Sequence, residues 1–175
     1  MNRRHLRLRK LQHRLRAIKQ WQRKMADRIS KDRRSWNMSR IRGKDTKIEV
    51  QARKYLFQKG FRYRKNVRKL PGCPDIVLPK YKSVIFVNGC YWHRHPFCHL
   101  ATTPKNNAAF WQDKFEKNVQ RDERNYKALQ ELGWNVIVIW ECEIRTDMEA
   151  IMQRVIRELE EQYIQKSLNR ETSEI

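Results

Sequence analysis

The sequence DIVLPKYKSVIFVNGCYWHRHPFC (residues 75–98) holds two short apolar runs and then a loop that is rich in cysteine and histidine. The runs at 75–78 and 83–87 are short and apolar after their first residues, Asp75 and Ser83, which is typical of buried strands. A third apolar run of the same kind follows at 134–140. We therefore predict that these three runs form buried strands of one sheet.

Helices and one further strand are predicted around these runs. Apolar residues recur at helical spacing over 46–60, over 108–132 and over 148–164. Residues 61–64 alternate aromatic and basic side chains, as an edge strand does. This order of elements predicts an α/β fold with helices on both faces of a mixed sheet. The helix at 108–132 is long enough to be the crossover between parallel strands.

The composition points to a polyanionic partner. Lys and Arg outnumber Asp and Glu by 40 to 19, which gives a formal net charge of +21. Such an excess favours nucleic acid first and an anionic membrane surface second. The sequence has no apolar run of about 18 residues and no signal peptide, so we expect a cytoplasmic protein without a membrane span. In such a protein, four cysteines favour a metal site or reduced thiols over disulfides.

The positive charge is densest at the N-terminus, where residues 1–24 hold ten Lys or Arg and no acid. Apolar residues recur there at helical spacing, so the segment fits a DNA-binding arm, a membrane-surface helix or a targeting sequence. Alternatively, Met25 is the true start and the segment lies upstream of it. We divide the chain into a basic extension (1–26), a main domain (27–150) that opens with a polar basic arm, and a C-terminal helix and tail (151–175).

Four residues have a spacing that suits zinc ligands: Cys90, His95, Cys98 and Cys142. Zinc takes four nitrogen or sulfur ligands in a tetrahedron. The first and last of these cysteines each follow an apolar strand closely, so strand pairing brings them together at little cost. The alternative is a set of buried free cysteines with an incidental histidine. His93 and His99 are rival ligands, and Cys73 is expected to be a free thiol.

The same region holds residues suited to chemistry on nucleic acid. Asp75 opens a buried strand and could bind Mg²⁺, although an acid after Pro74 can also simply close a turn. His93 could accept a proton near neutral pH, or it could be a solvated side chain. Tyr91 and Trp92 could stack on bases or wedge between them, or one ring could pack on the loop.

Two further acids have a structural explanation beside a functional one. Asp122 lies near the apolar face of the helix at 108–132, where an acid usually pairs with another group. A surface ion pair is the simpler interpretation. Glu49 follows Thr46 at capping-box spacing, which accounts for it without a catalytic role.

Several motifs occur together: PGCPD (71–75), VIFVNGCYWH (84–93), FW (110–111), KNVQRD (117–122), LQELGW (129–134), WEC (140–142), Asn37-Met38, and Asp45-Thr46 with Glu49. In combination they resemble the very short patch repair endonucleases, which act on DNA mismatches. The resemblance covers about residues 33–145. It implies a restriction-endonuclease-like core with a structural zinc site, in agreement with the element order.

The resemblance also implies roles for the matching residues. Asp75 corresponds to the Mg²⁺-binding carboxylate, and the backbone carbonyl of Val87 to the second metal contact. His93 corresponds to the catalytic histidine, and Glu49 to an acid near the active site. Asn88 replaces a histidine that, in some members, pairs with the acid at the position of Asp122.

Ligands and DNA contacts carry over in the same way. The predicted zinc ligands match those of the family: Cys90, His95, Cys98 and Cys142. One extra residue, Phe97, lies between the last two ligands of the loop. Tyr91 and Trp92 match aromatics that insert into DNA beside the mismatch, and Met38 matches a residue that enters from the other groove.

Members of this family nick DNA 5′ to the T of a T·G mismatch, which arises when 5-methylcytosine is deaminated. We therefore expect a Mg²⁺-dependent endonuclease that acts as a monomer on mismatched double-stranded DNA, with mismatch-repair proteins among its potential partners. One alternative is a zinc-stapled DNA-binding module without catalysis. Another is a nuclease of the same fold for a different lesion.

Overall fold

The computed structural model describes residues 30–40 and 43–171. The chain divides after residue 41 into two compact units, 1–41 and 42–175. The basic segment 1–26, with its apolar spacing and the interpretations proposed for it, lies outside the described residues.

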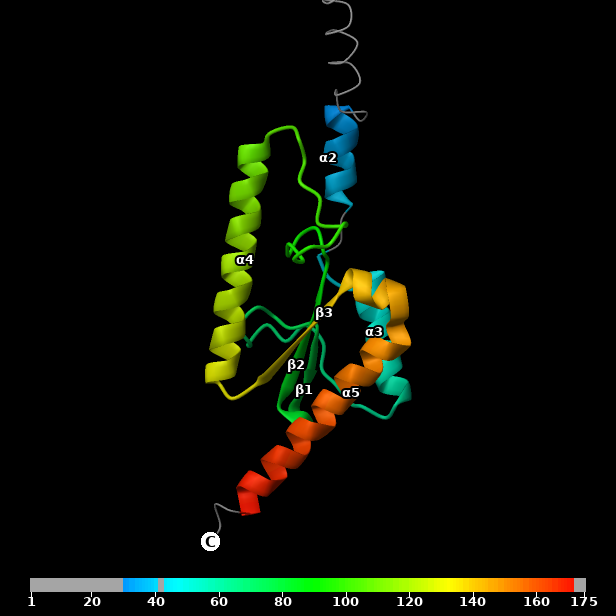
Figure 1. Cartoon of the computed structure of the whole chain (residues 1–175), viewed down its shortest axis with the longest axis vertical. Helices are drawn as coiled ribbons and strands as arrows, with labels where there is room; N and C mark the ends of the chain where they lie inside the picture. The colour runs from blue at the N-terminus through cyan, green and yellow to red at the C-terminus, as the bar shows by residue number, and fades with distance from the viewer. Residues whose placement is uncertain (1–29, 41–42, 172–175) are drawn as a thin grey trace, which may run out of the picture. The chain divides into compact units, whose positions relative to one another are not determined.

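The second unit is built on a sheet that, within the described residues, has three strands in the order β1-β2-β3 (Figure 1). β1 (Ile76–Leu78) pairs antiparallel with β2 (Ser83–Asn88), and β2 pairs parallel with β3 (Asn135–Trp140). The three apolar runs are therefore strands of one mixed sheet, as predicted.

The edge strand expected over 61–64 is reduced to one bridge. Arg64 and Val77 exchange two backbone hydrogen bonds of 2.8 Å at the free edge of β1. The pairing ends there because Asn66 has a φ of 49°, a left-handed conformation that turns the chain away from the extended direction.

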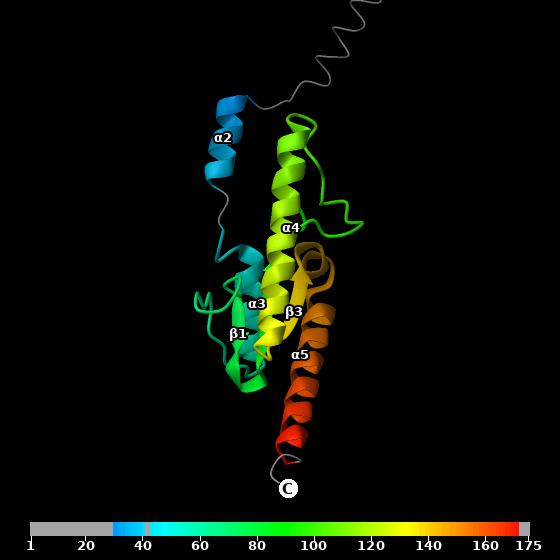
Figure 2. The same ribbon diagram turned by 90° about the vertical axis from the view of Figure 1, so that its left-hand side faces the viewer.

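The predicted helices are confirmed, and they cover both faces of the sheet. α4 (Ala108–Glu131) lies on one face, and α3 (Lys47–Gln58) and α5 (Glu141–Glu171) lie on the other (Figures 1 and 2). α5 is two helical segments joined at Asp147, whose φ of −153° is extended and whose side chain caps the Ala150 N–H. No described helix is both long and apolar enough to cross a membrane.

Alternation along the strands separates two apolar cores. Ile85 and Val87 of β2 face the larger core with α3 and α5, together with Leu56, Met152 and Leu159 from these helices. Val84 and Phe86 face a smaller core with Leu129 of α4. Successive side chains of a strand point to opposite faces of the sheet, so a strand that is buried on both faces contributes alternately to the two cores. The short turn η1 (Pro79–Tyr81) joins β1 to β2.

The first unit contains α2 (Lys31–Ser39), in a region that we expected to be a polar arm. The helix forms because the Ser30 hydroxyl accepts the Arg33 N–H at 3.2 Å and so caps its start. Trp36 lies on its surface, and the guanidinium groups of Arg33 and Arg40 both lie over its ring. Met38 is also on α2, with 38% of its surface exposed.

Candidate active site and metal centre

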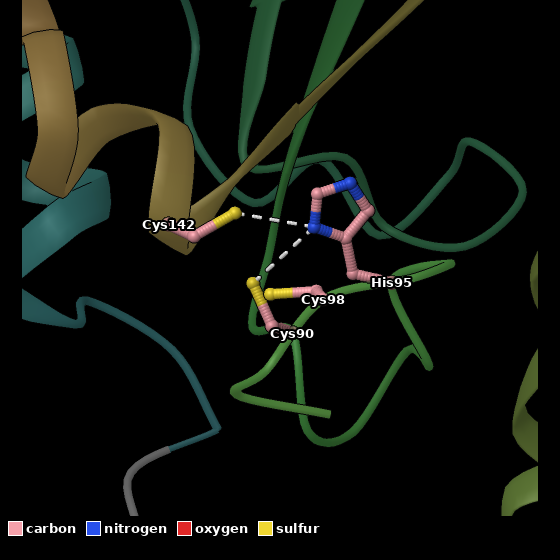
Figure 3. A group of neighbouring side chains, drawn as sticks. All are labelled: Cys90, His95, Cys98 and Cys142. Atoms are coloured by element: carbon pink, nitrogen blue, oxygen red, sulfur yellow. Dashed lines mark hydrogen bonds between the residues drawn. The ribbon is translucent and has the colours of Figure 1, made fainter. Parts of the chain in front are cut away.

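Four potential zinc ligands meet at the carboxyl ends of β2 and β3: Cys90, His95, Cys98 and Cys142 (Figure 3). Their sulfur and nitrogen atoms all lie within 4.8 Å of one another. The two strands are parallel neighbours, with Asn88 paired to Trp140, so the residues that follow each strand emerge side by side. Strand pairing thus unites cysteines that are far apart in the sequence.

The knuckle loop, residues 89–101, is shaped to present these ligands. Backbone N–H groups of His95 and Cys98 bond to the carbonyls of Cys90 and His95 and close two successive turns. The His95 ring stacks on Trp140 at 4.2 Å between centroids, which fixes its orientation. Its Nδ1 lies 3.2 Å from the Cys142 sulfur. The rival ligands His93 and His99 are not part of the group.

The donor set suits a tetrahedral thiophilic cation such as zinc. Three thiols and one imidazole are the ligands of a closed structural site, in which no position is left for water. Burial raises the pKa of the Cys90 thiol to about 12, so this sulfur would not ionise without a positive charge beside it. A bound cation would supply that charge, and the zinc ion itself stays a prediction.

Asp75 lies immediately before β1 and contacts the end of β2. Its Oδ2 accepts the backbone N–H of Val87 at 2.8 Å. Burial raises the pKa of Asp75 to about 6 despite this hydrogen bond. The negative charge of Glu49 acts in the same direction, whereas Arg53 and His93 lower the pKa. At neutral pH the carboxylate is therefore mostly ionised but poorly solvated, a state that favours binding a cation.

The peptide of Val87 lies next to the Asp75 carboxylate, as the predicted metal contact through its carbonyl would require. The Val87 side chain is buried in the larger core and takes no part in the site. Only the backbone of this residue is available for chemistry, so the side chain at this position is free to be apolar. The carbonyl contact to a metal stays a prediction.

His93 and Asp122 form a close pair. Nδ1 of His93 lies 2.5 Å from Oδ2 of Asp122, and Arg121 donates to the other carboxylate oxygen at 3.2 Å. Asp122 thus fixes the orientation of the imidazole, as an acid does in many proton-transfer sites. The Nε2 atom of His93 has no partner among the described residues and is the nitrogen left for proton transfer. The simpler interpretation of Asp122 as a surface ion pair is therefore incomplete.

Asn88 does not contact Asp122. Its amide Nδ2 donates to the hydroxyl oxygen of Tyr126 at 2.9 Å instead, and the side chain is buried. Tyr126 is a further residue of the candidate site, and we did not predict it from the sequence. Its position one helical turn after Asp122 is the signal that could have found it, because such residues share a helix face.

Glu49 is occupied by capping interactions. Oε2 accepts the Asp45 N–H at 2.8 Å, and Oε1 accepts the Thr46 hydroxyl at 2.7 Å. Glu49 is 4% exposed and reaches Asp75 through its charge rather than through contact. Arg53, also missed from the sequence, is buried beside it and pairs with Asp45 at 2.5 Å. The structure thus places Glu49 at the start of α3 as a capping residue near the site.

Tyr91 and Trp92 belong to an aromatic cluster between the knuckle loop and α4. The two rings meet edge to face at 4.9 Å, and Tyr91 also packs against Phe115 at 5.1 Å. Trp111 touches both rings, and Lys114 lies over Trp92 and Trp111. Trp111 and Lys114 of α4 were not among the residues predicted to contact DNA. Their spacing of three residues could have linked them, because residues at i and i+3 share a helix face.

α4 holds the knuckle loop against the sheet. Asn118 donates to the Trp92 carbonyl at 3.1 Å, one turn before the helix reaches Asp122. Arg94 stacks on Phe115 and donates to Thr102 and Thr103, which secures the far end of the loop. The potential zinc ligands of the loop, the aromatic pair and His93 are therefore all held by contacts between the knuckle loop and α4. Met38, the remaining predicted contact, belongs to the separate first unit.

Comparison with known proteins places the chain in a family. The sequence model of the family described as DNA mismatch endonuclease Vsr matches residues 26–99. The chain is 45% identical over 141 residues to the type II nicking enzyme V.NmeAIP of Neisseria meningitidis, covering 78% of this chain and 99% of that protein. It is 42% identical over 137 residues to the DNA mismatch endonuclease Vsr of Escherichia coli, covering 78% and 87%. A third relative, the type II nicking enzyme V.XorIIP of Xanthomonas oryzae, is 41% identical over 131 residues, covering 75% and 95%. The chain therefore belongs to the Vsr family of DNA mismatch endonucleases.

Proposed function

We propose that this protein nicks one strand of double-stranded DNA 5′ to the T of a T·G mismatch and so initiates very short patch repair of deaminated 5-methylcytosine. The observation that carries the proposal is the His93–Asp122 pair, which lies near the half-buried Asp75 carboxylate at the end of β2. An oriented imidazole beside an acidic cation site is a recurring arrangement for hydrolysing phosphodiesters. Family membership supports the assignment.

Asp75 and the Val87 carbonyl would hold a Mg²⁺ ion, whose preference for oxygen ligands matches both groups. Bound there, the ion would polarise the scissile phosphate and stabilise the leaving oxygen. The chain itself contributes the proton chemistry. Nε2 of His93 takes a proton from the attacking water or passes one on, while Asp122 holds the ring in place through Nδ1.

The predicted zinc ion has a structural role in this proposal. Cys90 and Cys142 join the knuckle loop to the first turn of α5, and His93 lies within that loop. A cation bound by all four side chains would fix the loop, and with it His93 and the aromatic pair, against the ends of β2 and β3. The chain is proposed to adopt a restriction-endonuclease-like core, consistent with its mixed sheet and flanking helices, and to act as a monomer.

Recognition of the mismatch is assigned to Tyr91 and Trp92 of the knuckle loop, whose rings pack against Trp111 and Phe115 of α4. Rings held in place by packing can enter a base step without first being ordered. Opening a step costs least at a mismatch, so insertion discriminates in favour of T·G. The high positive charge supplies affinity for DNA of any sequence.

A nicking assay tests the proposal directly. End-labelled duplexes with T·G, other mismatches, G·C or T·A at one position are incubated with protein and either Mg²⁺ or none. We expect a single cut 5′ to the T, confined to the T·G duplex and dependent on Mg²⁺. Equal cutting of all duplexes would contradict the mismatch specificity. Tight DNA binding without any cut would favour the zinc-stapled binding module.

A further inference from the structure

Tyr126 occupies a central position in the candidate site. It lies on α4 one turn after Asp122, and its ring packs against Phe86 at 4.9 Å. Asn88, at the end of β2, donates its amide N–H to the Tyr126 oxygen at 2.9 Å. The packing of the ring and this hydrogen bond together hold the hydroxyl group in place.

The hydroxyl of Tyr126 still has a proton to donate. A tyrosine oxygen can accept one hydrogen bond and donate another, and Asn88 occupies the accepting side. Among the described residues, no acceptor lies within hydrogen-bond reach of the hydroxyl proton. Burial, together with the negative charges of Asp122 and Asp75, raises the pKa of Tyr126 to about 12. The group therefore stays a neutral donor throughout the pH range of DNA repair.

The segment of α4 that carries Tyr126 also contacts the turn before Asp75. A Cβ at Gly72 would lie 3.0 Å from the Asn125 side-chain nitrogen, so the helix and this turn are in direct contact. The φ of 71° at Gly72 likewise excludes most other residues from the turn. Helix and turn are thus in contact, and the Tyr126 hydroxyl lies close enough to Asp122 and Asp75 for both charges to act on it.

We propose that Tyr126 is a further active-site residue and that its hydroxyl, held by Asn88, donates a hydrogen bond to a phosphate oxygen of the DNA. The inference rests on the proposed function, which brings a phosphate to Asp75. Phosphate oxygens accept hydrogen bonds readily from tyrosine hydroxyls. The amide of Asn88 does not titrate, so this arrangement keeps its geometry at every working pH.

The test compares Tyr126→Phe with Tyr55→Phe, a matched removal of one hydroxyl. Tyr55 lies on α3, and its hydroxyl bonds to Glu149 and Gln153 of α5, on the opposite face of the sheet. For each variant we measure single-turnover nicking of the T·G duplex, the dissociation constant for that duplex and the thermal midpoint. Both substitutions are repeated in an Asn88→Leu background, where no amide needs the tyrosine oxygen.

Tyr126→Phe is expected to slow nicking about tenfold in both backgrounds, with the dissociation constant within about twofold of wild type. Tyr55→Phe should lower only the thermal midpoint. A Tyr126→Phe rate within twofold of wild type would overturn the inference and leave the proposed function intact. A loss that disappears in the Asn88→Leu background would also overturn it, because the hydroxyl would then serve only the amide. If the wild-type protein nicks no duplex, the proposed function fails and the inference fails with it.

Discussion

The two clusters at the carboxyl end of the sheet differ in how completely their side chains satisfy one another. Where the knuckle loop meets α5, the three sulfurs and one imidazole nitrogen of the potential zinc ligands all lie within 4.8 Å of one another. At the neighbouring edge, Asp75 has one hydrogen bond from the backbone of Val87, and His93 keeps one nitrogen unengaged. A metal site whose four ligands are all side chains can stabilise the fold but has no position left for a substrate. Side chains with unused hydrogen-bonding atoms, such as Asp75 and His93, can still bind one. From this contrast we expect a structural role for the potential zinc ligands and a reactive one for Asp75 and His93.

The largest expected effect is on nicking, and it comes from a change at Asp75. Asp75→Asn should abolish nicking, by about a thousandfold or more, because the amide cannot hold a cation at the phosphate. DNA affinity should hold or rise, because a charge that repels phosphate is removed. Single-turnover nicking and fluorescence anisotropy on one preparation check both statements. Near wild-type nicking would show that Asp75 is not the cation ligand.

The next effect concerns the closed centre. Cys142→Ser should lower the zinc content and the soluble yield, because loss of one ligand separates α5 from the knuckle loop. Cys73→Ser is the matched control, since Cys73 is a half-buried cysteine outside the ligand group. Metal analysis and the thermal midpoint are measured for both variants. Zinc-free wild-type protein with full activity would contradict a structural role for the metal.

A smaller effect tests whether the knuckle also reads DNA. Trp92→Ala should reduce nicking of the T·G duplex about tenfold, which corresponds to the loss of about 1.4 kcal/mol of stacking. Zinc content should stay unchanged because no ligand is altered. Phe57→Ala, which removes an exposed ring from α3, serves as control and should leave the rate unchanged. If Trp92→Ala and Tyr91→Ala both keep wild-type rates and mismatch preference, the two rings only pack.

The smallest effect is on stability and follows from the raised pKa of Asp75, about 6. The folded state then binds its proton more tightly than the unfolded state, so ionisation costs stability as pH rises from about 4 to 6 and the full cost remains above 6. That cost is on the order of 3 kcal/mol at most. Asp75→Asn should therefore be more stable than wild type at pH 7.5 without added Mg²⁺.

The difference in stability should shrink as pH falls toward 5. Denaturant unfolding at several pH values measures it, with zinc content checked at each so that loss of metal is not mistaken for the effect. An equal difference between the two proteins at pH 7.5 and pH 5 would show that burial does not raise this pKa.

Much of the fold could be predicted from the chain itself. The runs at 75–78, 83–87 and 134–140 are strands, and the helices expected over 46–60, 108–132 and 148–164 are present. α2 was missed because its capping signal is one serine in a basic sequence with little apolar character. The edge strand was overestimated because alternation over 61–64 carries no information on the turn at Asn66.

The candidate site was likewise predictable only in part from the sequence. The four potential zinc ligands were predicted from residue type and spacing, because the chemistry of metals restricts both. For Asp75 and His93 the spacing left simpler interpretations open, and their roles were predicted from the resemblance to the endonuclease family. The partners of these residues were decided only by tertiary structure. Asp122 meets His93, and Asn88 meets Tyr126 rather than Asp122, because α4 crosses the sheet in one particular rotation about its axis. Spacing along a helix limits which residues share a face, but the packing of Leu129 and Phe86 determines where that face points.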